Sequence, residues 1–179
     1  MFSCVRKAMF MTDPNRRAVM VFGAILAIAP SAVLSASRPP IVLFVCPAGT
    51  AKSAIARELF RKRAKERGIA ATAFSRGLHI EDHISVPLRQ RLDAESINTR
   101  RDGFFDLKAN DVRAADIVVT FAPLPSPYRS DKQRDWSAVP SVNDAWPAAR
   151  ADLDRRIDAL LDGIGTISTK RRGPRSRVP

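Results

Sequence analysis

The sequence contains few cysteines, and this scarcity excludes two classes of small domain. Only Cys4 and Cys46 are present among 179 residues, and they form no Cys-x-x-Cys pair. A disulfide framework and a cysteine-based zinc site are therefore both excluded. Internal repeats are lacking as well. The remaining composition, with 45% hydrophobic and 27% charged residues, is that of a globular domain with a core of ordinary size.

Signals of nucleic-acid recognition are missing too, although the net charge is +12. The sequence has no finger motif, no aromatic-rich basic stripe and no recognition-helix pattern. The charge is concentrated at the two ends, because residues 1–38 carry +4 and residues 170–179 carry +5, which leaves +3 for residues 39–169. We therefore predict no nucleic-acid partner. Residues 166–179 are predicted to form a basic disordered tail.

The N-terminal region has the pattern of a secretory signal. Arg16 and Arg17 precede an uncharged stretch, residues 18–36, which ends in small residues. This stretch is also long enough for a marginal membrane span. We predict that residues 1–38 are a signal peptide or a membrane anchor, and that the protein is exported or tethered to a membrane through residues 18–36. A mis-assigned start codon would instead make it cytoplasmic.

The body of the chain, residues 39–165, alternates between apolar runs and helical periods. Residues 41–45 and 115–121 are apolar throughout, as buried parallel strands are, and residues 69–75 are predicted as another strand. Helices are predicted over residues 51–67, 86–95 and 152–161, with a short one near residues 110–112. The alternation predicts an α/β fold, a three-layer sandwich with a central, mainly parallel four-stranded sheet. The proline-rich residues 122–147 are predicted to be a long functional loop.

The segment VLFVCPAGTAKS, residues 42–53, predicts a strand, a short loop and the start of a helix. Its Lys-Ser ending resembles a nucleotide-binding phosphate loop. However, aligning that motif places Cys46 and Ala51 where its two glycines belong. The strand at residues 115–121 also ends without an aspartate for magnesium. A nucleotide-binding loop is therefore excluded.

A thiol-based anion site fits the same segment better. Cys46 stands at the carboxyl end of a parallel strand, and the backbone N–H groups that follow can bind an anion at a helix N-terminus. Gly49 tolerates a positive φ, Lys52 is expected to face the oxyanion, and Ser53 can donate a hydrogen bond to the thiolate. The alternative is that Cys46 is a small apolar residue packed at the strand end.

The stretch IVLFVCPAGTAKSAIARELF, residues 41–60, resembles the signature of low-molecular-weight protein tyrosine phosphatases and of the arsenate reductases that share their fold. These families carry Cys-x5-Arg-[Ser/Thr] between a strand and a helix. The resemblance continues through residues 75–78 and through NDVRAADIVVTF, residues 110–121, and it covers about residues 39–163. It implies that Cys46 is the nucleophile, assisted by Lys52 and Ser53, with no cofactor. It also implies a phosphate-binding loop made of Pro47, Ala48, Gly49, Thr50, Ala51 and Lys52.

The sequence departs from this pattern at three positions. Lys52 stands in place of the family arginine, whose planar fork binds two phosphate oxygens where lysine offers one point charge. Gly49 replaces an asparagine. Ala122 stands where thioredoxin-coupled reductases have a cysteine after the third strand, so an intramolecular disulfide relay is excluded.

The loops contain candidates for a general acid and for a metal site. The resemblance implies an acid in an Asp-Pro-Tyr-like stretch before the last helix, which matches Asp144 with Trp146 as the substrate-stacking residue. The other alignment places Ser141 at the acid position. His79 and His83 flank two acidic residues, but they lack a third ligand and a helical setting, so we predict no metal site.

The sequence therefore predicts a phosphatase-like enzyme that acts on a phosphotyrosine-type phosphomonoester through a phosphorylated Cys46. Two alternatives remain open. One is a non-catalytic protein of the same fold that binds an oxyanion or a partner. The other is a single-cysteine arsenate reductase that uses an external thiol. The expected ligand is a phosphorylated substrate or an inorganic oxyanion.

Overall fold

The structure, a computed structural model, describes residues 38–172, with side chains through residue 165. The predicted signal peptide or anchor thus lies outside the described residues except for Arg38, as do residues 173–179. Within the described part of the chain, no helix is both long enough and apolar enough to cross a membrane.

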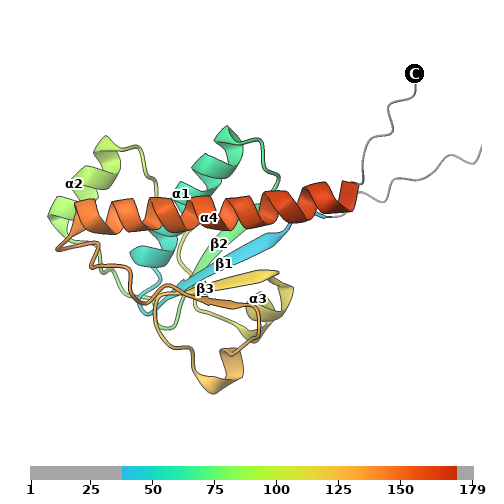
Figure 1. Ribbon diagram of the computed structural model, residues 1–179. Coiled ribbons are helices and arrows are strands. Elements are labelled where there is room, and N and C mark those ends of the chain that lie inside the picture. The colour runs from blue at the N-terminus through green and yellow to red at the C-terminus, as the bar shows by residue number, and fades with distance from the viewer. Residues whose placement is uncertain (1–37, 173–179) are drawn as a thin grey trace, which may run out of the picture. The chain divides into compact units, whose positions relative to one another are not determined.

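Four parallel strands form the central sheet, in the order β2-β1-β3-β4 (Figure 1). The strands are β1 Ile41–Cys46, β2 Thr72–Gly77, β3 Ile117–Thr120 and β4 Gln133–Asp135. The helices are α1 Lys52–Glu66, α2 Val86–Ala94, α3 Ala109–Ala114, the 3-10 helix η1 Ser126–Tyr128 and α4 Trp146–Arg172. This architecture confirms the predicted α/β class with a parallel four-stranded sheet.

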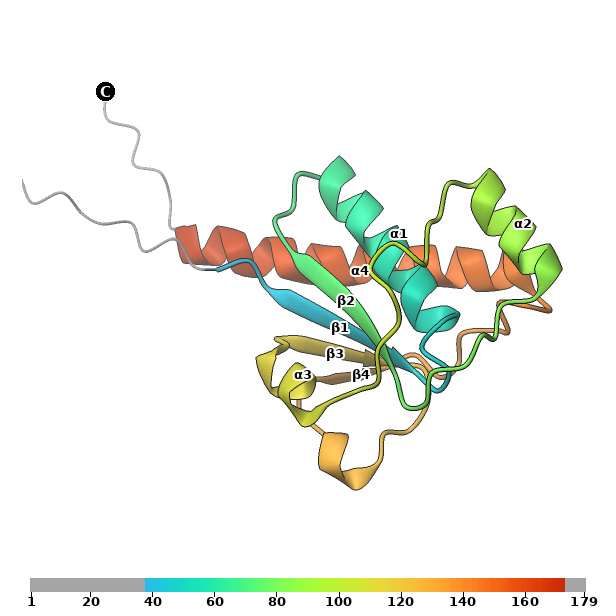
Figure 2. The same ribbon diagram turned by 180° about the vertical axis from the view of Figure 1, so that it is seen from behind.

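Helices cover both faces of the sheet (Figure 1 and Figure 2). Successive side chains of a strand point to opposite faces, so β1 serves both layers. Val42 and Phe44 pack into the core shared with α1, α2 and α4. Leu43 and Val45 pack into a smaller core with α3. Burial on both faces explains why β1 is apolar throughout. Cys46 is the last residue of this central strand.

Helix α1 follows the predicted boundaries closely, and it buries an arginine. Arg57 is only 1% exposed. Its guanidinium donates to Glu58 Oε1 at 2.9 Å, to Ser75 Oγ at 2.9 Å and to the carbonyl of Thr99 at 2.7 Å. Buried charges are tolerated when they are paired and hydrogen-bonded, and this network ties α1 to β2.

Three boundaries differ from the sequence prediction. Strand β2 begins at Thr72 rather than residue 69, because Ile69 still closes the C-terminus of α1 through a hydrogen bond to Ala64. Helix α4 runs over residues 146–172 rather than 152–161 and so continues into the segment predicted to be disordered from residue 166. The loop predicted over residues 122–147 contains η1 and β4. The polar strand β4 has no apolar run that could reveal it.

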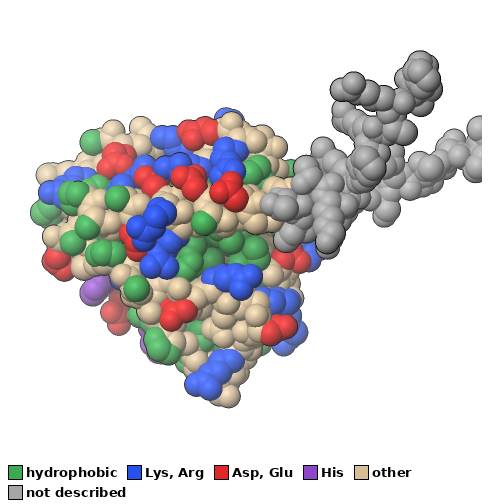
Figure 3. All heavy atoms as spheres, in the orientation of Figure 1, with side chains coloured by type: hydrophobic (Ala, Val, Ile, Leu, Met, Phe, Trp, Pro, Cys, Tyr) green, Lys and Arg blue, Asp and Glu red, His purple; other side chains and the backbone are tan. Residues whose placement is uncertain are grey.

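Charged side chains of both signs alternate over the face that carries α4 (Figure 3). Part of this pattern comes from ion pairs between α1 and α4, in which Arg63 binds Asp154 and Asp158. The mixed surface agrees with the small net charge of residues 39–169. It forms no large basic patch on the face that Figure 3 shows.

Candidate active site

Cys46 lies at the carboxyl end of β1 and is 4% exposed. Its Sγ lies 3.1 Å from Ser53 Oγ and accepts a hydrogen bond from the backbone N–H of Gly49 at 3.2 Å. Hydrogen bonds of this kind stabilise a thiolate. The prediction that Ser53 contacts the sulfur is therefore confirmed.

Residues 47–51 curl around this sulfur into the start of α1. Gly49 adopts φ +70°, so the expectation that it supplies a left-handed residue is confirmed. The hydroxyl of Ser53 also contacts the Gly49 carbonyl at 3.3 Å, which fixes the curl from inside. No side chain caps α1, and the first N–H groups of a helix lack partners within it. They give the loop the positive end of the helix dipole.

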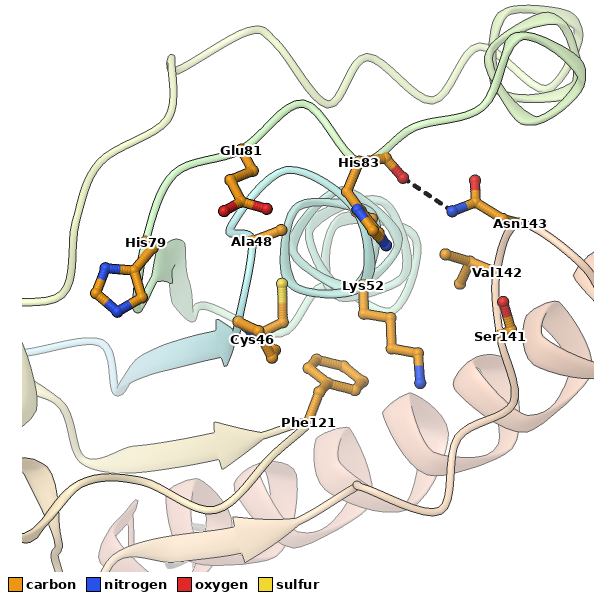
Figure 4. A pocket seen from close by; sticks show the side chains of 12 residues that line it. Cys46, Ala48, Lys52, His79, Glu81, His83, Phe121, Ser141, Val142 and Asn143 are labelled. Atoms are coloured by element: carbon orange, nitrogen blue, oxygen red, sulfur yellow. Dashed lines mark hydrogen bonds between the residues drawn. The ribbon is translucent and has the colours of Figure 1, made fainter.

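A cavity of about 390 Å³ opens above Cys46 (Figure 4). It is bordered by the loop after β1, the segment between β2 and α2, the residue that follows β3, and the segment before α4. The residues that line it are Cys46, Pro47, Ala48, Ala51, Lys52, His79, Glu81, His83, Phe121, Ser141, Val142 and Asn143. Two residues of the predicted phosphate-binding loop do not line the cavity. Gly49 donates its N–H to the Cys46 sulfur, and the Thr50 side chain is buried.

The segment after β2 is clamped onto the loop after β1. Backbone N–H groups of residues 78, 79 and 81 donate to the carbonyls of residues 46–48 at 3.0–3.2 Å. From the other side, Thr50 Oγ1 donates to the Glu81 carbonyl at 2.6 Å and accepts from the His83 N–H at 3.2 Å. Sequence reasoning missed this role of Thr50, because no local signal links residues 31 positions apart.

Asn143 joins a second pair of segments at the cavity. Its Oδ1 accepts from the Ser85 N–H at 2.9 Å, and its Nδ2 donates to the His83 carbonyl at 2.8 Å (Figure 4). The segment before α4 is thereby held against the segment before α2. Asn143 was also missed from the sequence, since its partners lie about 60 residues away.

Lys52 lines the cavity, but its amine does not point at the sulfur. Nζ donates to the Val139 carbonyl at 2.5 Å, and in Figure 4 the side chain extends toward Ser141. Burial lowers the pKa of Lys52, and the Coulombic attraction of Cys46 opposes this effect. The expectation that Lys52 faces the oxyanion is therefore met only in part, because its closest partner is a loop carbonyl.

Asp144 does not line the cavity, contrary to the position expected of the acid. Its side chain is exposed, and Oδ2 accepts a hydrogen bond from Ser141 Oγ at 2.6 Å. The residue that reaches the cavity from this segment is Ser141, as the other alignment implied. The turn over residues 141–144 separates the two positions.

Trp146 is not placed to stack on a substrate. It is 5% exposed and belongs to the core formed with α1, α2 and α4. Its Nε1 donates to Glu95 Oε1 at 2.9 Å, which satisfies the indole at the end of α2. The prediction failed because Trp146 begins α4 and faces inward, so the aromatic wall of the cavity is Phe121 instead.

His79 and His83 lie in the segment between β2 and α2, which is not helical, as expected. Both line the cavity. Within the described residues, no group of three histidine, cysteine or acidic side chains is arranged to hold a metal ion.

Comparison with known proteins agrees with this geometry. The sequence model of the low molecular weight phosphotyrosine protein phosphatases matches residues 41–132, just over half of the chain. The chain belongs to this family. No curated protein sequence matches it significantly. The family match covers Cys46, Lys52 and Ser53 and ends before Ser141 and Asp144, the two positions at which the sequence resemblance placed the acid.

Solved structures of phosphatases and arsenate reductases share the fold. YfkJ from Bacillus subtilis is 17% identical at a TM-score of 0.61, and the match covers 73% of this chain and 98% of that one. The YwlE arginine phosphatase from Geobacillus stearothermophilus is 19% identical at a TM-score of 0.59, and the match covers 74% of this chain and 97% of that one. A thioredoxin-dependent arsenate reductase from Corynebacterium glutamicum is 23% identical at a TM-score of 0.55, and the match covers 73% of this chain and 64% of that one. At these identities the likeness shows the fold of the family.

Proposed function

We propose that the chain is a thiol-dependent phosphatase that hydrolyses phosphomonoesters through a phosphorylated Cys46. The observation that carries the proposal is the Cys46 sulfur at the base of the cavity, held by Ser53 Oγ and the Gly49 N–H. The uncapped N-terminus of α1 supports an anion at the same place. Nucleophile and anion site thus coincide, as in-line phosphoryl transfer requires.

The chemistry follows from this arrangement. The Cys46 thiolate attacks phosphorus, the bond to the leaving oxygen breaks, and the phosphoryl group passes to sulfur. The loop N–H groups stabilise the charge on the phosphoryl oxygens. The Ser53 hydroxyl stabilises the thiolate when it departs, as water hydrolyses the S–P bond and releases phosphate.

The proposed substrate is a phosphomonoester of the phosphotyrosine type. Phe121 and Val142 give the cavity an apolar wall, and its volume of about 390 Å³ suits a phosphorylated ring. The family description, phosphotyrosine protein phosphatase, supports the same class.

Trapping the intermediate tests the proposal. Acid quenching of the protein during turnover of an aryl phosphate should leave one phosphoryl group on the peptide that contains Cys46, as measured by mass spectrometry. Turnover with the phosphoryl group on a different residue, or no turnover at all, would contradict the mechanism. Arsenite release from arsenate and a small external thiol, without phosphatase activity, would favour the single-cysteine reductase.

A second candidate function is oxyanion binding without turnover. The specific observation in its favour is the hydrogen bond from Lys52 Nζ to the Val139 carbonyl, which directs the amine away from the sulfur. Where an arginine would grip two phosphoryl oxygens, the chain offers a single amine already engaged by a carbonyl.

Replacing Lys52 with arginine distinguishes these candidates. The guanidinium has five donors, so it can keep the Val139 contact and still present N–H groups to the phosphoryl oxygens. One oxyanion donor contributes a factor on the order of 10²–10³ to kcat. We expect Lys52→Arg to raise kcat for an aryl phosphate about tenfold or more.

The matched control is Lys52→Met, which keeps the length of the side chain and removes its charge. It should lower both phosphate affinity and kcat. If Lys52→Arg lowers activity as much as Lys52→Met does, the loop has adapted to lysine and the arginine clashes with it.

A further inference from the structure

The cavity contains a carboxyl side chain that has no role in the mechanism described above. Of the described residues that line it, Glu81 alone has a carboxyl side chain. Neither Asp82 nor Asp144 is among them, although both lie close in the sequence to residues that are. A carboxyl group beside the place of the bound phosphate can serve as a general acid or base.

The backbone of Glu81 is fixed to the loop that surrounds Cys46. Its N–H donates to the Ala48 carbonyl at 3.2 Å, and its carbonyl accepts from Thr50 Oγ1 at 2.6 Å. These two partners flank Gly49, whose N–H binds the sulfur. The position of Glu81 relative to Cys46 is thus set by short contacts between its own segment and the loop after β1.

The Glu81 side chain has no hydrogen-bond or ion-pair partner among the described residues. The neighbouring carboxylate behaves differently: Asp82 pairs with Arg89 at 3.1 Å and lies 3.7 Å from Arg100. Figure 4 shows the Glu81 carboxylate pointing toward Ala48 and the Cys46 sulfur, whereas the His79 ring points away from them. Glu81 is therefore free to meet a group bound above the sulfur.

We propose that Glu81 is the catalytic acid and base of this reaction, a role that the sequence assigned to Asp144. The inference rests on the proposed function. In the first step the thiolate attacks phosphorus and the P–O bond breaks, and the Glu81 carboxyl gives its proton to the leaving oxygen. In the second step water attacks phosphorus, the Glu81 carboxylate takes the proton of that water, and the S–P bond breaks to restore the thiolate.

The proposal explains why Asp144 can turn away from the cavity. Asp144 accepts a hydrogen bond from Ser141, the residue that occupies the cavity wall on that side. The proposed acid, Glu81, instead lies on the segment between β2 and α2, across the cavity from Ser141.

The experiment compares two substrates with leaving groups of different quality. We expect Glu81→Gln to lower kcat/KM for phenyl phosphate by about 10²–10⁴, the usual contribution of a general acid. For 2,4-dinitrophenyl phosphate, whose leaving group needs no proton, the loss should be below about tenfold. Glu81→Gln should also remove the alkaline limb of the pH profile of kcat/KM. Because the side chain has no partner, the melting temperature should not change.

The matched control is Asp82→Asn, which removes the adjacent carboxylate and leaves Glu81 in place. It should stay within about twofold of the wild type on both substrates. Equal losses on both substrates for Glu81→Gln, or none, would overturn the role of Glu81 while leaving the phosphatase itself intact. A leaving-group effect carried by Asp144→Asn or His83→Gln instead would overturn it as well. A wild type without turnover on either substrate would reject the proposed function, and this inference with it.

Discussion

Replacing Cys46 with serine is expected to abolish hydrolysis of aryl phosphates, with a loss on the order of 10⁴–10⁶ in kcat, the range seen when an enzyme loses its nucleophile. The hydroxyl of serine can still accept the hydrogen bond from Gly49 and contact Ser53. It does not ionise near neutral pH, however, so the attacking anion is missing. The loop and the N-terminus of α1 are untouched.

Phosphate should therefore continue to bind to Cys46→Ser. Ten millimolar phosphate should raise the melting temperature of the variant about as much as that of the wild type, since only binding to the folded state enters the shift. The control for a purely local disturbance is Ser53→Ala, which keeps the nucleophile and removes one contact to it. The kcat of Ser53→Ala for aryl phosphates should fall about 10–100-fold. A Cys46→Ser variant within tenfold of the wild type would mean that another residue carries the chemistry.

The sequence predicts best those parts of the fold whose residues are buried on two sides. Strands β1 and β3 were located because burial on both faces makes them continuously apolar. Strand β4 has the sequence Gln-Arg-Asp and was missed, since an exposed edge strand needs no apolar pattern. The burial of Arg57 in α1 has no local sequence signal, because only the fold shows that Ser75 and Thr99 supply its partners.

The same division holds at the active site. The contact of Ser53 with Cys46 and the positive φ of Gly49 were predicted because these residues lie within eight positions of one another, where a strand-loop-helix geometry follows from local spacing. Ser141 was implied by one alignment, but two other residues that line the cavity were not predicted. Glu81 and Asn143 reach the site from segments far along the chain, and their positions depend on how those segments dock.

The second large effect concerns Gly49, whose replacement by alanine should dismantle the anion site. A Cβ at this position would lie 2.8 Å from both the Cα and the N of Gly77, and 2.6 Å from Ile80 Cδ1. The isoleucine methyl group can rotate away, but the backbone at the end of β2 is held in the sheet by its pairing with Cys46. We expect phosphate binding to be lost and kcat/KM to fall at least a hundredfold, the effect of displacing an oxyanion donor.

Gly68 provides a matched control, because it shares the backbone conformation of Gly49 without its surroundings. Its φ is +62°, close to the +70° of Gly49, yet a Cβ there would meet nothing within 4 Å. Gly68→Ala thus reports the cost of a left-handed alanine alone, about 1–2 kcal/mol of stability. Activity and phosphate affinity should not change in that variant.

The difference between the two variants isolates the contact between the loop and the end of β2. If Gly49→Ala loses only as much stability as Gly68→Ala and still binds phosphate, the loop can move off Gly77 without losing its N–H groups. A loop displaced in this way would also lengthen the hydrogen bond from the Glu81 N–H to the Ala48 carbonyl, since both contacts close the same loop against the same segment. The expected loss of phosphate binding in Gly49→Ala alone would mean that close packing of the two glycine backbones holds the Gly49 N–H at the Cys46 sulfur.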